Sequence, residues 1–209
     1  MSFQKQLATG RVAEGWIAQW LMARGHKVMP AYEIEVSQFK GPQLFSAQGE
    51  FVSPDMIVFS SNGVIWVEAK HKSVFTWYRK GQRWTTGIDY HHYTHYQEVA
   101  RQTGLPVWLA FFHRESRPDS RDLRYKCPPK CPTGLFIEDL SQLVLRESHR
   151  SPAKDAHRKG VLGHGRYGMV YWSDASLRRV ASCEEVYALA QETRNPLEAT
   201  NQTQRAVAT

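Results

Sequence analysis

The chain has 209 residues, of which 42% are hydrophobic and 22% charged, as expected of a globular protein with one substantial core. No apolar run approaches the roughly 20 residues of a membrane span, and the first residues, MSFQKQLATGR, lack the apolar core of a signal peptide. We therefore expect an intracellular, cytoplasmic protein without a membrane partner. The net charge of +7 favours polyanionic partners such as nucleic acid, and the odd count of three cysteines argues against a disulfide-stapled secreted scaffold.

The first predicted element is a helix from about residue 4 to 24, closed by Gly25. Its apolar face carries Leu7, Glu14, Ile17, Ala18 and Leu21 at helical spacing. Glu14 is thus a carboxylate on an inward face, where an uncompensated charge is costly. Either its side chain reaches solvent at the edge of that face, or a cation or metal lies opposite.

A strand over residues 26–34 and a loop over 36–52 are predicted next, and the loop leads to a hairpin over 53–70, SPDMIVFSSNGVIWVEAK. Asn-Gly between two β-rich apolar runs is the strongest local hairpin signal. Pairing of the two runs brings Asp55 and Glu68 to the same end of neighbouring strands. Strand alternation places Glu68 and Lys70 on one face and Ala69 on the other.

Two carboxylates and an amine at one end of a sheet are suited to phosphodiester hydrolysis. Asp55 and Glu68 offer oxygen ligands for a hard divalent cation, and Lys70 offers a charge that orients water and offsets developing negative charge. The alternative is an ordinary surface hairpin with solvated charges.

The spacing of Pro54-Asp55, twelve intervening residues and Glu68-Ala69-Lys70 resembles the PD-(D/E)XK nuclease superfamily, which includes restriction endonucleases, Holliday-junction resolvases and phage exonucleases. The resemblance covers about residues 5–113. It implies an α/β, restriction-endonuclease-like core, a mixed central sheet flanked by helices. It further implies Mg²⁺ or Mn²⁺ held by Asp55, Glu68 and the Ala69 carbonyl, a first-helix Glu14 near the site, and products with 5′-phosphate and 3′-hydroxyl ends.

A second hairpin, with a turn at Lys80-Gly81, is predicted to project from the catalytic edge as an insertion. Aromatic and basic residues alternate along it: Trp77, Tyr78, Arg79, Lys80, Arg83 and Trp84. They either stack on bases and contact phosphates, or the aromatic residues pack on the protein while the charges are solvated.

A helix over residues 88–103, ending at Gly104, places Tyr93 and Gln97 on one face. In the PD-(D/E)XK superfamily, which this chain resembles, a Gln or Tyr from the corresponding helix often lies at the mouth of the active site. The resemblance therefore implies that Gln97 positions water or phosphate and that Tyr93 contacts nucleic acid. The histidines of this helix, His91, His92 and His95, are read as surface residues near a phosphate rather than as metal ligands.

The remaining elements are predicted as an apolar central strand (105–113), a long loop (114–132), a strand and helix (135–147), a basic loop (148–166), a strand (167–172), a helix (183–191) and a disordered tail from 192. We expect one domain over 1–191, in which residues 114–191 elaborate the core.

Cys127 and Cys131 flank Pro-Pro-Lys and could form half of a zinc site completed by His149, His157 or His164. No second cysteine pair exists, so we favour a loop with free thiols over structural zinc or a local disulfide.

The sequence therefore predicts a divalent-metal-dependent deoxyribonuclease, possibly phage-encoded and possibly a homodimer. The alternative is a non-catalytic nucleic-acid-binding module that keeps the nuclease fold. Endonuclease and exonuclease activity are not distinguished.

Overall fold

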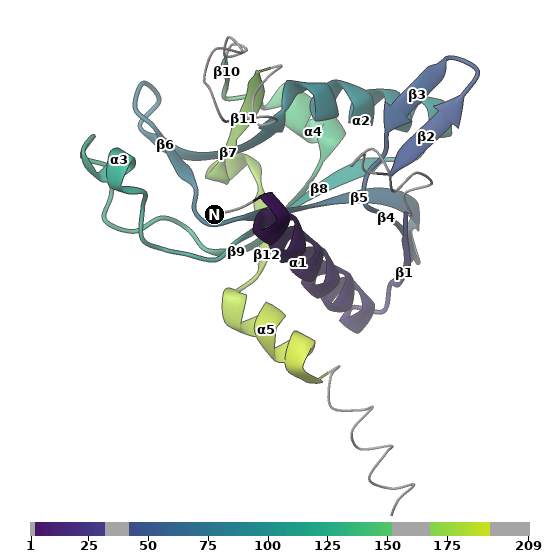
Figure 1. Cartoon of the computed structure of the whole chain (residues 1–209), viewed down its shortest axis with the longest axis horizontal. Helices are drawn as coiled ribbons and strands as arrows, with labels where there is room; N and C mark the ends of the chain where they lie inside the picture. The colour runs from purple at the N-terminus through teal and green to yellow at the C-terminus, as the bar shows by residue number, and fades with distance from the viewer. Residues whose placement is uncertain (1–2, 32–41, 152–167, 193–209) are drawn as a thin grey trace, which may run out of the picture.

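A six-stranded mixed sheet lies at the centre of the molecule (Figure 1). The computed structural model describes residues 3–31, 42–151 and 168–192, with side chains for 12–31, 42–151 and 168–190. The strands of the central sheet, in spatial order, are β1 (Lys27–Pro30), β4 (Met56–Ser60), β5 (Gly63–Lys72), β8 (Val107–His113), β9 (Gly134–Asp139) and β12 (Arg178–Ala181). Only β5 and β8 pair in parallel. The parallel pair is central, which explains the near-continuous apolar run of β8.

A second, four-stranded antiparallel sheet has the order β10 (His149–Ser151), β11 (Met169–Ser173), β7 (Arg83–Asp89) and β6 (Thr76–Tyr78). The predicted second hairpin is therefore present as β6–β7, with a turn at 79–82. It does not project as an isolated insertion, because β7 also pairs with β11. A separate hairpin joins β2 (Gln43–Ser46) to β3 (Gly49–Val52).

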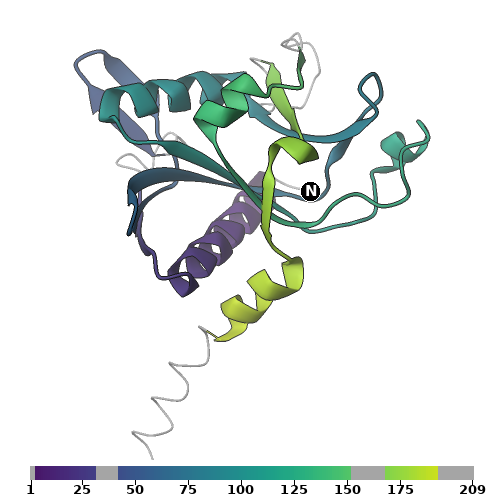
Figure 2. The same ribbon diagram turned by 180° about the vertical axis from the view of Figure 1, so that it is seen from behind.

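Helices cover both faces of the central sheet. Helices α1 (Phe3–Ala23) and α5 (Cys183–Glu192) pack on one face, where Ile17 and Val186 contact the side chains of β5, β8 and β9. Helices α2 (Tyr90–Thr103) and α4 (Leu140–Leu145) and the four-stranded sheet lie on the other face, and Figure 2 shows the same layers from behind. Two shorter pieces, α3 (Ser120–Leu123) and η2 (Asp174–Ser176), complete the secondary structure of the described residues.

The predicted mixed α/β architecture, with a central mixed sheet flanked by helices, is confirmed. The predicted first helix, first hairpin, central strand and final helix all occur close to their predicted bounds. The α2 helix ends at Gly104, whose φ of 67° is the left-handed conformation that glycine adopts readily. No helix that the structure describes is long and apolar enough to cross a membrane.

Three boundaries were wrong. Residues 43–52, predicted as loop, form β2–β3, because Phe51 packs edge-on against His95 and the Val52 N–H donates to His95 Nδ1 (2.7 Å). Both contacts come from α2, more than 40 residues later, and no local pattern reports them. The short strands β10 and β12 were missed, and residues 88–89 belong to β7 rather than to the helix.

The C-terminal half is more than an elaboration of a finished core. Strands β9 and β12 complete the central sheet, and α5 packs beside α1 on it. The predicted tail, most of the predicted basic loop and the end of the predicted first strand lie outside the described residues.

Candidate active site

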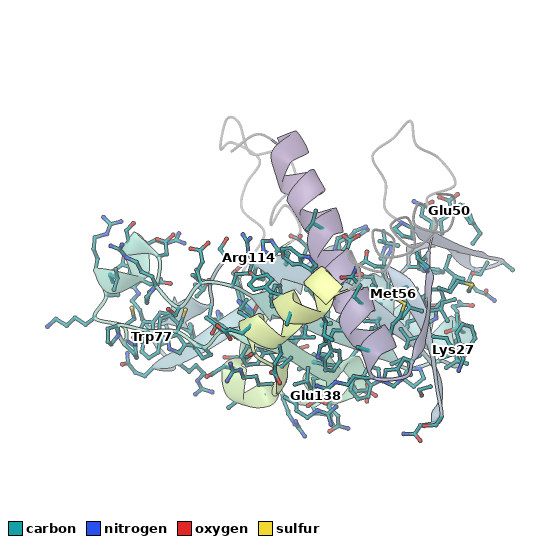
Figure 3. All side chains as sticks on the ribbon, turned by 90° about the horizontal axis from the view of Figure 1, so that it is seen from below. Lys27, Glu50, Met56, Trp77, Arg114 and Glu138 are labelled. Carbon is teal, nitrogen blue, oxygen red and sulfur yellow. The ribbon has the colours of Figure 1, made fainter. Side chains whose placement is uncertain are left out.

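Asp55 stands at the head of β4, and its carboxylate is fixed by the neighbouring strand. Its Oδ2 accepts a hydrogen bond from the backbone N–H of Ala69 on β5 (2.8 Å). The next residue, Met56, is labelled in Figure 3 beside α1 and pairs with Val67. In an antiparallel pair the N–H and C=O of one residue point to the same neighbour. The Ala69 carbonyl therefore also faces the side on which Asp55 lies.

Glu68 and Lys70 share one face of β5. Val67 and Ala69 belong to the core under α1, whereas Trp66 belongs to the core under α2, so alternation turns Glu68 and Lys70 toward α2. The Lys70 ammonium forms an ion pair with Glu68 Oε1, and the side chains are 26% and 1% exposed, respectively. The other oxygen, Glu68 Oε2, is buried without a hydrogen-bond partner among the described residues.

Glu14 joins this group from α1. Its charge raises the pKa of Asp55 and also that of Lys70. The neighbouring Ala13 and Ile17 are buried against the sheet, so the helix face predicted to point inward does so and carries Glu14 toward the cluster. We refer to Asp55, Glu68, Lys70 and Glu14 as the carboxylate–lysine cluster.

The cluster holds more negative than positive charge. Burial raises the pKa of Asp55 well above its ordinary value, the charges of Glu68 and Glu14 raise it further, and Lys70 and the Ala69 N–H only partly oppose them. Burial lowers the pKa of Lys70, but the charges of Glu68 and Asp55 outweigh this and leave it raised. Three carboxylates thus act on one ammonium, and this imbalance of charge favours an additional cation.

Helix α2 contributes two side chains that the sequence did not single out as site residues. Tyr96 is 1% exposed, and its pKa is raised by burial and then by the charges of Glu68 and Asp55, with a hydrogen bond to Glu68. The pKa of His92 falls to about 4, mainly through burial and then through the charge of Lys70. Residues His92 and Tyr96 follow Asp89, the last residue of β7, by three and seven residues. Side chains at this spacing lie on one face of a helix. That spacing is the signal that could have found them.

Gln97 and Tyr93 lie elsewhere on α2. The Gln97 amide donates to the carbonyl of Tyr93 within the same helix (3.2 Å). Tyr93 is 3% exposed, packs near Trp172 and donates its hydroxyl to Glu147. No contact recorded within the described parts of the chain joins either residue to the cluster. The prediction that Tyr93 contacts nucleic acid is corrected, because its ring is in the core.

The β6–β7 hairpin separates the residues that were predicted as one nucleic-acid-binding group. Trp77 and Trp84 pack edge-on (4.9 Å between ring centroids) on the core side, and Trp84 is 7% exposed. For Trp84 this favours the packing interpretation, because a buried indole cannot stack on a base; Trp77 is half-buried. Arg79 and Lys80 are exposed at the turn, where the Arg79 guanidinium lies 3.8 Å from the Tyr125 ring. Arg83 is also exposed.

The cysteines are free thiols. Cys131 is buried and its Sγ donates to the Glu115 carbonyl (3.2 Å), whereas Cys127 is half-buried. Of the histidines considered as zinc partners, His149 is stacked between two tyrosine rings, and His157 and His164 lie outside the described residues.

The cluster offers oxygen ligands, which suit a small hard cation. Within residues whose side chains are described, no three His, Cys, Asp or Glu side chains form a metal-binding group. Mg²⁺ commonly takes one or two carboxylates and keeps several waters. Asp55, the unpartnered Glu68 oxygen and the Ala69 carbonyl form such a partial set of oxygen ligands.

Comparisons with known proteins give little. No family model and no curated protein matches the chain. Among solved structures, the chain is similar to Hjc from Archaeoglobus fulgidus, a Holliday junction resolvase, with a TM-score of 0.43 and 9% sequence identity over 80% of this chain and 90% of that chain. This likeness is distant.

Proposed function

We propose that the protein is a divalent-metal-dependent nuclease that hydrolyses phosphodiester bonds in DNA. One observation carries the proposal: three carboxylates act electrostatically on a single lysine, and the buried one, Glu68, leaves its Oε2 without a partner among the described residues. Unpaired buried charge is expensive and persists where function requires it. In a chain with a net charge of +7, a negative, oxygen-rich site suits a cation that acts on a polyanion.

Asp55, Glu68 and the Ala69 carbonyl would hold Mg²⁺ or Mn²⁺, with waters completing the ligand set. When bound, the ion would supply Lewis-acid polarisation of a phosphate oxygen and charge neutralisation. It would also balance the excess carboxylates of the cluster. Asp55 suits this role because only its Oδ2 is engaged by the Ala69 N–H, so its other oxygen can face the ion.

Lys70 would act as a positioned cation. Its ion pair with Glu68 holds the ammonium at the cluster, and with 26% of its side chain exposed it can meet a phosphate group. There it would orient the attacking water and offset charge on the phosphorus oxygens, an effect concentrated in the transition state. Glu14 would restrain Lys70 from the α1 side, and Tyr96 would hold the Glu68 carboxylate in place.

The test is a cleavage assay with supercoiled, linear, single-stranded and branched DNA, each with Mg²⁺, with Mn²⁺ and with EDTA. We expect cleavage of at least one substrate with metal and none with EDTA. Lys70→Met, purified in parallel, controls for contaminating nucleases because it keeps the apolar stem and removes the charge.

Absence of cleavage on every substrate, with normal DNA binding, would contradict the proposal. It would instead support the alternative of a non-catalytic nucleic-acid-binding module. Cleavage that persists in Lys70→Met at the wild-type rate would remove the cluster from the chemistry.

A further inference from the structure

The four-stranded sheet has an inner and an outer face. Trp84, Ile88, Val170 and Trp172 point into the core. Residues one position away on the same strands point the other way. By strand register Tyr78 pairs with Arg83, and Tyr171 pairs with both Gly87 and His149. We call the residues Tyr78, Arg83, His149 and Tyr171 the outer aromatic face.

Three rings of this face form one stack. The His149 ring lies 3.7 Å from the Tyr78 ring at an interplanar angle of 7°, and 4.5 Å from the Tyr171 ring at 2°. All three side chains are half-buried. Since His149 is covered on both sides, the ring surface left for a ligand belongs to the two tyrosines.

Two glycines make room for the tyrosine rings. A Cβ at Gly87 would lie 2.9 Å from the Tyr171 ring and 2.2 Å from the Val170 carbonyl oxygen. A Cβ at Gly81 would lie 2.7 Å from the Tyr78 ring. Both contacts are too close for a side chain, so the positions of the two rings require glycine at 81 and 87.

Two arginines act electrostatically on the stack. Burial lowers the pKa of His149 and the charge of Arg83 lowers it further, whereas Tyr171 is influenced by the opposite charges of Asp89 and Arg121. Arg83 and Arg121 are both exposed. Their guanidinium groups can therefore contact phosphates beside the rings.

We propose that the outer aromatic face binds an unpaired strand of DNA. Bases in a duplex are stacked on each other and their faces are closed to side chains, whereas unpaired bases stack on aromatic rings while arginines contact the backbone. This inference concerns binding and does not depend on the proposed nuclease function.

The test measures binding in EDTA, so that no cleavage interferes. Fluorescence anisotropy of the full chain with a labelled single-stranded oligodeoxynucleotide is compared with the duplex of the same sequence. Tyr78→Ala should weaken single-strand binding roughly 5- to 150-fold, the effect of losing one stacked base, and leave duplex binding within about twofold. Tyr78→Phe should restore wild-type affinity because it keeps the ring.

Arg83→Ala gives a second, independent arm. It should lower the slope of log affinity against log salt by about 0.7 for the single strand, the value for one phosphate contact. The matched control is Arg101→Ala, an exposed arginine on α2 that pairs with Glu98. This control should change neither affinity nor salt slope.

Unchanged single-strand affinity in folded Tyr78→Ala, or equal losses for single strand and duplex, would overturn the inference. If Tyr78→Ala does not fold, an unchanged salt slope in Arg83→Ala overturns it. The two proposals fail separately. A wild-type protein that never cleaves, but loses single-strand binding in Tyr78→Ala, refutes only the nuclease. A metal-dependent nuclease with normal binding in both variants refutes only this inference.

Discussion

The carboxylate–lysine cluster and the outer aromatic face differ in how far their charged groups are exposed to water. In the cluster, Glu68 is 1% exposed and each ionisable group changes the pKa of its neighbours. On the outer face, Arg83 is exposed and the rings are held by stacking. Electrostatic interactions are strong in a buried site and weak in water. Substitutions in the cluster should therefore act almost all-or-none, and those on the outer face should act in moderate, separable steps.

The largest effect should come from Lys70→Met. Turnover should fall by about 10²–10³-fold or more, while DNA affinity stays within a few-fold, because the lost interaction belongs to the transition state. Single-turnover rates and anisotropy on the same substrate measure both quantities. Lys27→Met, at an exposed position labelled in Figure 3 on β1, is the matched control and should leave both unchanged. A large loss of binding in Lys70→Met would make this residue part of the binding surface instead.

The next effect separates the two faces of one hairpin. Trp84→Ala should lower the free energy of unfolding by about 3–5 kcal/mol, because it removes a large side chain from the core. Arg83→Ala, one residue earlier on the outer face, should change it by less than about 0.5 kcal/mol. Urea denaturation measures both. A stable Trp84→Ala variant with weakened DNA binding would reverse the assignment of the faces.

A smaller effect follows from the crowded carboxylates. The pKa of Asp55 is raised above its ordinary 3.8, so the folded state keeps this proton to higher pH than the unfolded state. Stability without metal should therefore fall as the pH rises from about 3.8 through the raised folded pKa. Asn at this position keeps an acceptor for the Ala69 N–H and removes the charge. Asp55→Asn should thus melt a few degrees above wild type at pH 7 in EDTA.

Mn²⁺ provides the complementary measurement. It should raise the melting temperature of the wild type and raise that of Asp55→Asn much less, since the variant lacks one ligand. Glu115→Gln, which removes an exposed carboxylate, is the control and should behave as wild type. A lower melting temperature for Asp55→Asn than for wild type in EDTA at pH 7 would show that repulsion between the carboxylates does not destabilise the folded protein.

The smallest effects are expected at the cysteines. Cys127→Ser should leave activity and stability nearly unchanged, and Cys131→Ser should cost about 1 kcal/mol, because a more polar hydroxyl replaces a buried thiol. Metal analysis of the purified protein completes the test. A stoichiometric zinc signal that both variants lose would establish a structural metal in this loop.

The carboxylate–lysine hairpin could be predicted because its signals are local. The Asn-Gly turn sets the register, and alternation then fixes the faces of Glu68 and Lys70. The sequence could not single out Tyr96 for a different reason. Helical spacing finds sets of residues on a face but does not say which face meets the sheet. That choice depended on β5 and β8, which are distant in sequence.

The same limit explains the outer aromatic face. The sequence shows that side chains alternate along β6 and β7. Which of the two faces turns toward the core depends on pairing with β11, more than 80 residues later. Because the sequence does not say which face is inward, it predicts a single nucleic-acid-binding group that includes Trp77, Tyr78, Arg83 and Trp84. The structure divides them, and the strand pairing of Tyr171 and His149 supplies partners that no local pattern could indicate.

The hydrogen bond from Ala69 to the Asp55 carboxylate also bears on how the chain reaches its native state. A slip of one residue between β4 and β5 would break this bond and turn Glu68 and Lys70 to the α1 face. Such a misregistered hairpin would lack the proposed set of oxygen ligands. A divalent ion would then bind and stabilise only correctly paired chains, so metal availability during refolding should raise the yield of native protein.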